Sequence, residues 1–125
     1  MSVVKAKKNY LGLDGNRRMN CALSIMSAFR ESHSLPEEEI ISVGRCSGGT
    51  APGGLCGAYY AATFVLKGQT EVLEKQFREK AGSLKCREIR AGKRLSCLEC
   101  VEQCARIIEE CSDEMSKREL QYKGI

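Results

Sequence analysis

The sequence predicts an all-α protein: a compact bundle of about five helices with a glycine-rich loop before a central buried helix. Apolar residues recur at helical spacing along most of the 125 residues. No stretch alternates apolar and polar residues for long, as a half-buried strand would. Two Ser-x-x-Glu capping signals mark helix starts. The chain is long enough for one hydrophobic core and too short for two.

The N-terminal segment differs from the rest by its charge. We interpret residues 1–18 as a basic arm and residues 19–125 as a single helical, cysteine-rich domain. The arm accounts for the whole net charge of +4. Its charged residues are Lys5, Lys7, Lys8, Asp14, Arg17 and Arg18. Because it has almost no periodic apolar surface, we expect it to lie outside the bundle and to be dispensable for folding.

The first two helices of the domain follow the arm. Apolar spacing predicts a helix over residues 20–31. Ser34 and Glu37 then form a capping box, with Pro36 in the first turn. This box predicts a second helix that ends near Gly44.

The central helix is expected over residues 55–67. It carries no charge until its end and should therefore be buried all round. Small residues along it allow neighbouring helices to approach closely. These are Gly57, Ala58, Ala61 and Ala62.

The C-terminal half begins with a strongly charged helix, "TEVLEKQFREKAG", which Gly82 ends. Its inward residues are predicted to be Val72, Leu73 and Phe77. "SLKCREI" is expected to form a short helical turn, followed by a basic connector. Ser96 and Glu99 form the second capping box and start a last helix that runs to about residue 119.

The composition excludes several classes of protein. Beyond residue 18 the positive and negative charges balance, aromatic residues make up 6%, and Trp is absent. A nucleic-acid binder would show a basic stripe with interleaved aromatics, so we expect no nucleic acid as partner. The longest uncharged segment, residues 55–66, is too short to cross a bilayer, so we expect no membrane insertion. We find no export signal and expect a cytoplasmic protein.

Eight cysteines are the unusual feature of the composition. They are Cys21, Cys46, Cys56, Cys86, Cys97, Cys100, Cys104 and Cys111. Cytosolic reductants keep ordinary thiols reduced, which favours metal or redox chemistry over structural disulfides. The alternative is that the cysteines pack as small hydrophobic residues.

Three thiol sites each have a feature that favours the thiolate. Cys97 and Cys100 lie in the first turn of the last helix, where free N–H groups and the helix dipole stabilise negative charge. Cys56 begins the central helix in the same way. Cys86 lies among cations in "KCREIRAGKR". We therefore predict Cys56, Cys86 and Cys97 as redox thiols.

The glycine loop before Cys56 is expected to serve the same site. Gly53, Gly54 and Gly57 allow backbone N–H groups to face an anionic cofactor. Four thiolates without histidine suit an iron–sulfur cluster or a tetrahedral zinc. The predicted metal ligands are Cys56, Cys86, Cys97 and, from its spacing on the last helix, Cys100.

The remaining cysteines and the single histidine receive other roles. Cys104 and Cys111 share one face of the last helix with Cys97 and Cys100, and we interpret them as core residues. His33 is interpreted as a solvated surface residue.

With these residues identified, the chain resembles a family of small redox-active proteins named for a cysteine signature: one Cys, a CGAxxG motif and two further Cys. The matching segments are "NCALSIMSAF", "GGTAPGGLCGAYYAA", "FREKAGSLKCREI" and "SCLECVEQCARII", within residues 19–110. The final glycine of the motif is Ala61 here, which suggests tight helix packing. The family pattern implies Cys21 as the fourth ligand beside Cys56, Cys86 and Cys97. A related domain accompanies haem and an iron–sulfur centre in split-Soret cytochromes, but this chain lacks the C-x-x-C-H motif for covalent haem.

We therefore expect a redox-active protein whose clustered thiolates bind an iron–sulfur cluster, or another metal such as zinc, for electron transfer. Two alternatives stay open: metal-free thiol–disulfide chemistry, and a helical interaction module whose cysteines are mainly packing. The expected partner is another redox protein, and pairing into a homodimer is left open. The residues do not decide whether the protein is an enzyme.

Overall fold

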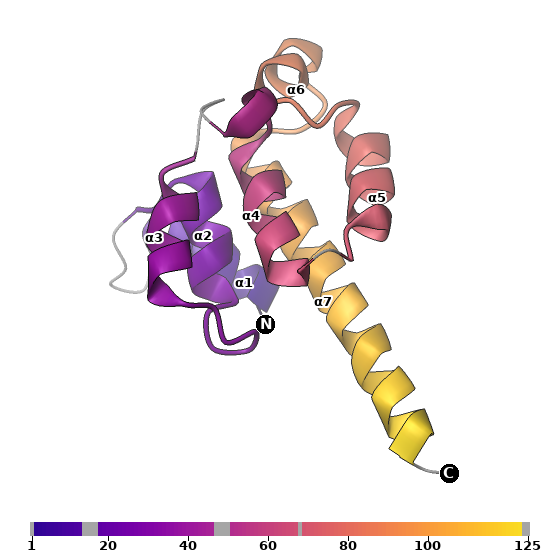
Figure 1. The fold of residues 1–125 in the computed structure, drawn as a ribbon. Coiled ribbons are helices and arrows are strands. Elements are labelled where there is room, and N and C mark those ends of the chain that lie inside the picture. Colours follow the sequence, from indigo (N-terminus) through magenta and orange to yellow (C-terminus); the bar gives the residue numbers. More distant parts are fainter. Residues whose placement is uncertain (1, 14–17, 47–50, 68, 124–125) are drawn as a thin grey trace.

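The computed structural model describes residues 2–13, 18–46, 51–67 and 69–123, with the backbone alone for residue 2 and residues 112–123. These residues form seven α-helices and no strand (Figure 1). The helices are α1 (Ser2–Leu11), α2 (Cys21–Ala28), α3 (Glu37–Gly44), α4 (Gly57–Leu66), α5 (Glu71–Ala81), α6 (Cys86–Gly92) and α7 (Cys97–Lys123). A 3₁₀ turn, η1 (Pro52–Gly54), precedes α4. The all-α prediction is confirmed, with seven helices in place of about five.

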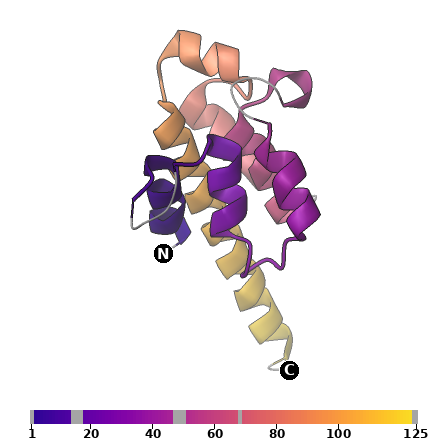
Figure 2. The same ribbon diagram turned by 90° about the vertical axis from the view of Figure 1, so that its left-hand side faces the viewer.

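Helices α4 and α7 pack against each other at the centre of the bundle. Helix α2 lies against both of them, with α3 outside it, and α5 packs on α7 from the other side (Figure 1). Helix α6 covers the end of the bundle at which α4 and α7 begin. The C-terminal half of α7 extends beyond the other helices in both views (Figures 1 and 2).

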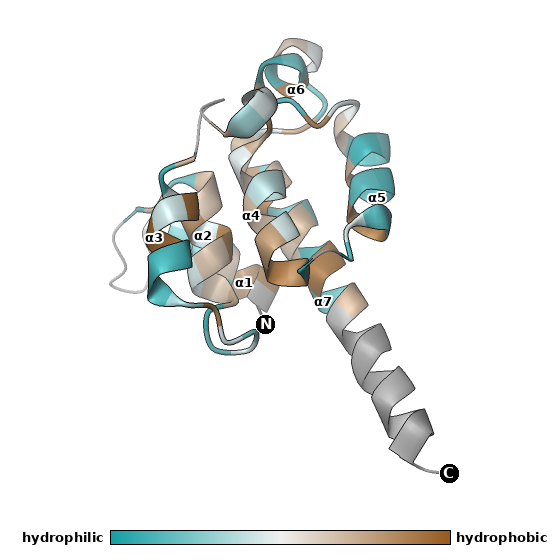
Figure 3. Cartoon of the chain, in the orientation of Figure 1, coloured by the Kyte–Doolittle hydropathy of each residue, from teal (hydrophilic) through white to brown (hydrophobic). Residues whose placement is uncertain are grey.

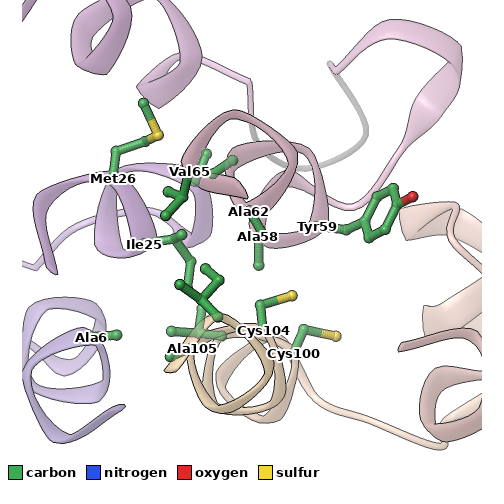
Figure 4. Close-up of a cluster of buried hydrophobic side chains, with 14 of the residues drawn as sticks. Ala6, Ile25, Met26, Ala58, Tyr59, Ala62, Val65, Cys100, Cys104 and Ala105 are labelled. Carbon is green, nitrogen blue, oxygen red and sulfur yellow. The ribbon is translucent and has the colours of Figure 1, made fainter. Parts of the chain in front are cut away.

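The core sits where α2, α4 and α7 meet (Figure 4). Ala58 and Ala62 of α4 are fully buried, so the backbone of α4 approaches its neighbours closely, as expected. Cys104 and Ala105 face them from α7 and are equally buried. Helix α4 is not buried all round, however. Its remaining surface is half-buried at Tyr60, Thr63 and Phe64.

Helix α5 illustrates how the amphipathic pattern is used. It is hydrophilic along most of its length (Figure 3), while Leu73 and Phe77 are fully buried. Phe77 stacks on Tyr59 of α4, with ring centroids 5.5 Å apart. Gly82 ends the helix with φ +84°, as predicted. Val72 is a correction: it is 45% exposed, because Leu73 rather than Val72 lies on the face that carries Phe77.

The basic segment is a second correction. Ser2–Leu11 is a helix packed against α2 and α7, not an arm outside the bundle. Ala6 is fully buried, and Asn9, 3% exposed, donates from Nδ2 to the carbonyl of Ser24. The buried strip of α1 contains a small and a polar residue, so it does not stand out as apolar periodicity. Residues 14–17, with Asp14 and Arg17 of the predicted arm, lie outside the described residues.

The two predicted capping boxes have different outcomes. At α7, the amide of Glu99 donates to Ser96 Oγ (3.1 Å) and the Ser96 amide donates to Glu99 Oε1 (3.0 Å), which confirms the box. At α3, Ser34 is left-handed (φ +50°) and Pro36 is the N-cap without a side-chain bond. The tight turn after α2 takes Ser34 out of the capping position.

Candidate functional site

Five cysteines line one small cavity, which we call the cysteine cavity. Its other lining residues are Ile89, Arg90 and Leu95. The five are Cys21, Cys56, Cys86, Cys97 and Cys100. The cavity measures about 20 Å³, room for about one water molecule. All five predicted cysteines are therefore brought together by the fold.

The cysteines reach the cavity from four helix starts. Cys21, Cys86 and Cys97 are the first residues of α2, α6 and α7. Cys56 is the N-cap of α4, and Cys100 lies one turn into α7. The positive ends of the helix dipoles thus face the same group of sulfurs. Such an arrangement stabilises negative charge on the thiols.

The segment before α4 is fixed to the start of α6. The Cys56 amide donates to the carbonyl of Leu84 at 2.8 Å, and Leu55 and Lys85 form an isolated antiparallel bridge. Gly53 and Gly54, at φ +69° and +74°, make the preceding turn. This short backbone pairing places Cys56 beside Cys86.

Cys56 and Cys100 both line the cavity and influence each other's pKa. Donation by the Cys100 thiol is the largest influence on Cys56 and, against the opposing effect of burial, lowers its pKa to about 7. The backbone amides of Tyr59 and Ala58 at the start of α4, and the charge of Arg90, act in the same direction. The same hydrogen bond, together with burial, raises the pKa of Cys100. Cys56 is thus the thiolate of the pair and Cys100 its donor.

Cys97 occupies the more open side of the cavity and is half-buried. Arg90 Nη2 points to its sulfur at 3.9 Å. The side chain of Tyr10 lines a surface groove next to this sulfur. Burial and the nearby Cys97 raise the pKa of Tyr10, so that the phenol keeps its proton. Polar groups from α1 and α6 therefore surround Cys97.

The other two cavity thiols are held in the protonated form. Burial, followed by the charges of Cys56 and Cys97, raises the pKa of Cys21 to about 11. Burial also raises the pKa of Cys86, which is 8% exposed. The expectation that the surrounding cations make Cys86 a thiolate is wrong: Arg90 lowers its pKa, but burial outweighs it.

The glycines predicted to bind a cofactor do not line the cavity. Nothing lies within 4 Å of a Cβ built on Gly53 or Gly54, and Gly57 is buried in the first turn of α4. The amides close to the sulfurs belong instead to Ala58, near Cys21 and Cys56, and to Tyr59, near Cys56. A cofactor role for the glycines stays a prediction.

The remaining cysteines lie outside the cavity. Cys104 is fully buried in the core (Figure 4), as predicted, and burial raises its pKa. Cys111 packs half-buried against the core. The thiol of Cys46, just after α3, faces the carbonyl of Ser42 at 3.8 Å.

His33 is half-buried rather than fully solvated. Its ring packs edge-on to Phe29, with centroids 5.4 Å apart. Burial, and then the charge of Lys67, lower its pKa. It does not line the cavity, so it forms no Cys–His pair there.

Sequence reasoning placed Arg90 only among the cations around Cys86 and did not assign it to Cys97, and it missed Tyr10. Arg90 lies four residues after Cys86, a spacing that places both on one face of α6, so its position near the site was readable from the pattern. Tyr10 could not be found, because α1 was not expected to dock.

The site has limited fit to a single metal ion in this conformation. Among the described side chains, no three Cys, His, Asp or Glu residues form a group that could hold an ion.

No helix in the described part of the chain is long and apolar enough to span a membrane.

Comparison with known proteins gives one match. A family model described as "Putative redox-active protein (C_GCAxxG_C_C)" matches residues 19–111. The motif in that name is written GCAxxG, whereas this chain reads CGAYYA over residues 56–61. No curated protein and no solved structure matches the chain significantly.

Proposed function

The chain belongs to the C_GCAxxG_C_C family of redox-active proteins, and we propose that its redox centre is the cysteine cavity, where Cys56 and Cys100 cycle between dithiol and disulfide. The observation that carries this proposal is that both thiols line one small cavity, with Cys56 at the N-cap of α4 and Cys100 one turn into α7, the helix against which α4 packs. Thiols that share a cavity of about 20 Å³ need only a small side-chain movement to reach the S–S bond length of about 2.05 Å.

The protonation states suit this chemistry. Thiol–disulfide exchange needs a thiolate as nucleophile, and exchange is fastest when its pKa lies near the ambient pH. Cys56, with a pKa of about 7, meets this condition. When an external disulfide accepts two electrons and two protons, it becomes two thiols while Cys56 and Cys100 form the protein disulfide. The reverse reaction returns the dithiol.

The experiment is to oxidise the reduced protein with an excess of a small disulfide and to map the disulfides by peptide mass spectrometry. We expect a Cys56–Cys100 crosslink and a reversible reduction potential. Cys56→Ser and Cys100→Ser should each abolish this crosslink. Cys46→Ser, outside the cavity, is the matched control and should leave it unchanged. A fully reduced Cys56 and Cys100 after prolonged oxidation would refute the proposal.

An iron–sulfur cluster is the second candidate, and the number of converging thiols favours it. A cluster takes four cysteine ligands, and five cysteines line the cavity. The four ligands would be Cys56, Cys86, Cys97 and either Cys21 or Cys100. When bound, a cluster would supply one-electron transfer. The helix starts and Arg90 would offset its negative charge.

The size of the cavity weighs against this candidate in the present conformation. A cluster is far larger than the one water molecule for which the cavity has room, so binding would require the segments that line the cavity to move apart. The test is an optical spectrum with iron and acid-labile sulfide analysis of anaerobically purified protein. Zinc analysis of the same sample tests the single-ion alternative.

A further inference from the structure

A groove opens on the surface beside the cysteine cavity, and we call it the entrance groove. It measures about 380 Å³, which lies in the range of small-molecule sites. Its lining includes Tyr10, Arg18, Asn20 and Arg90, together with Cys21 and Cys97. Cys21, Arg90 and Cys97 also line the cavity, so the groove and the cavity meet at these three residues.

The charge of the groove has one sign. Arg18 and Arg90 are exposed, and no carboxylate is among the lining residues. Arg18 lies over the ring of Tyr10, 5.9 Å from its centroid, which orients the guanidinium. The amide of Asn20 is already used, because it caps α2 and donates to the carbonyl of Gly44. The two arginines are therefore the groups left to bind a ligand, and an arginine fork suits a carboxylate.

A ligand in this groove would meet two thiols, Cys21 and Cys97. Burial raises the pKa of Cys21, so Cys97 is the more reactive candidate. Cys56 and Cys100 lie behind it, with 5% and 3% of their surface exposed. Arg90 donates toward the Cys97 sulfur, and Tyr10 lines the same groove. Such a donor stabilises the charge that develops on a sulfur during exchange.

From this geometry we propose that the entrance groove binds low-molecular-weight disulfides that carry carboxylates, and that Cys97 is the thiol that attacks them. The proposal rests on the Cys56–Cys100 couple proposed above. It adds a substrate class, a binding site and an entry thiol to that couple.

The exchange balances in three steps. The Cys97 thiolate attacks one sulfur of the substrate disulfide, and the other sulfur leaves as a thiolate and takes a proton. The Cys56 thiolate then attacks Cys97, which releases the second substrate thiol. Finally Cys100 attacks Cys56, and its proton passes to Cys97 as that sulfur leaves. One substrate disulfide becomes two thiols, and the protein dithiol becomes the Cys56–Cys100 disulfide.

The charge preference can be tested with two disulfides of similar length and opposite charge, dithiodipropionate and cystamine. Because their leaving thiols differ in pKa, each rate with the protein is divided by the rate of the same disulfide with a free small thiol. We expect this normalised rate to be higher for the dicarboxylate, with a preference that declines as salt is added. Arg18→Gln should slow oxidation by dithiodipropionate about fivefold, which is the effect expected when one exposed ion pair is lost. The rate of oxidation by cystamine should not fall. Arg87→Gln removes an equal charge from α6 outside the groove and is the control. Equal normalised rates for the two disulfides, or equal effects of the two substitutions, would overturn the groove as an anion site.

The entry thiol can be identified by trapping. In the double variant Cys56→Ser and Cys100→Ser, the first step should stop at a mixed disulfide on Cys97, detected as a mass adduct on its peptide. An adduct mainly on Cys21 or Cys86 would overturn the role of Cys97.

A single variant keeps this test independent of the fold of the double one. Cys97→Ser should slow oxidation by dithiodipropionate about tenfold or more, because the buried pair is then not reached through exchange. The uncharged oxidant diamide should still form the Cys56–Cys100 disulfide. An unchanged rate with dithiodipropionate refutes the entry role alone. Failure of every oxidant to form the disulfide refutes the proposed function and this inference together.

Discussion

Replacing Cys100 by alanine is the sharpest test of the electrostatics of the cavity. The thiol of Cys100 is the largest cause of the lowered pKa of Cys56. Without it, burial opposes only the two amides and Arg90, and we expect the pKa of Cys56 to return toward the ordinary value of 9.0. Cys100→Ser is the matched variant, because its hydroxyl can still donate to the Cys56 thiolate while the disulfide partner is lost in both.

The expected change in reactivity follows from two opposing effects. At pH 7 about half of Cys56 is thiolate in the natural chain, against about one part in a hundred at a pKa near 9. The more basic thiolate is intrinsically more nucleophilic, by about eightfold over two pKa units. Cys100→Ala should therefore react about sixfold more slowly at pH 7. At a pH above both pKa values, Cys56 is a thiolate in the natural chain and in the variant, and Cys100→Ala should then react faster than the natural chain.

The assay is alkylation by iodoacetamide at a series of pH values, with the peptide that carries Cys56 quantified by mass spectrometry. The midpoint of each profile reports the pKa and does not depend on how accessible the buried sulfur is. We expect a midpoint near 7 for the natural chain, a low midpoint for Cys100→Ser and a high one for Cys100→Ala. Two results would refute this explanation. One is that Cys100→Ala leaves the midpoint of the Cys56 profile unchanged. The other is that Cys100 becomes reactive at a lower pH than Cys56 in the natural chain.

Three further predictions concern stability and can be measured by urea unfolding. Ala6→Glu should destabilise the protein by about 3 kcal/mol, because it buries an unpaired charge between α1 and α7. Lys5→Glu, on the exposed face of α1, should change the free energy of unfolding little. Equal effects of the two substitutions would mean that α1 does not dock. Phe77→Ala should cost about 3–5 kcal/mol and Val72→Ala less than about 0.5 kcal/mol, since the first is fully buried and the second 45% exposed; a larger loss at position 72 would contradict the orientation of α5. Ser96→Ala should cost about 1 kcal/mol by removing the cap of α7, and an unchanged free energy of unfolding would argue against the capping box.

The features that the sequence predicted correctly depend on near neighbours along the chain. The stop of α5 at Gly82 and the capping box of Ser96 and Glu99 are both local patterns, and both are present. The five cavity cysteines were also recognisable, because each one lies at or within one turn of a helix start that the pattern marked.

The failures have a common physical cause: the burial and pairing of a side chain depend on which helices face each other. Apolar periodicity did not reveal the docking of α1, because Ala6 and Asn9 carry little apolar surface. The cations around Cys86 suggested a thiolate, but its burial against the cavity outweighs them. In the same way, periodicity led us to place both Val72 and Leu73 inward, but only Leu73 is buried.

The sequence by itself determined the helical class, the helix starts and the set of thiols placed at them, because these follow from contacts within a few residues. Only the tertiary structure decided how the thiols are paired. The bridge between Leu55 and Lys85 places Cys56 beside Cys86, and the packing of α4 on α7 brings Cys56 to Cys100. The docking of α1 brings Tyr10 to Cys97. The pairing of Cys56 with Cys100, and its effect on the pKa of Cys56, arises between segments more than forty residues apart, where no local pattern in the chain can encode it.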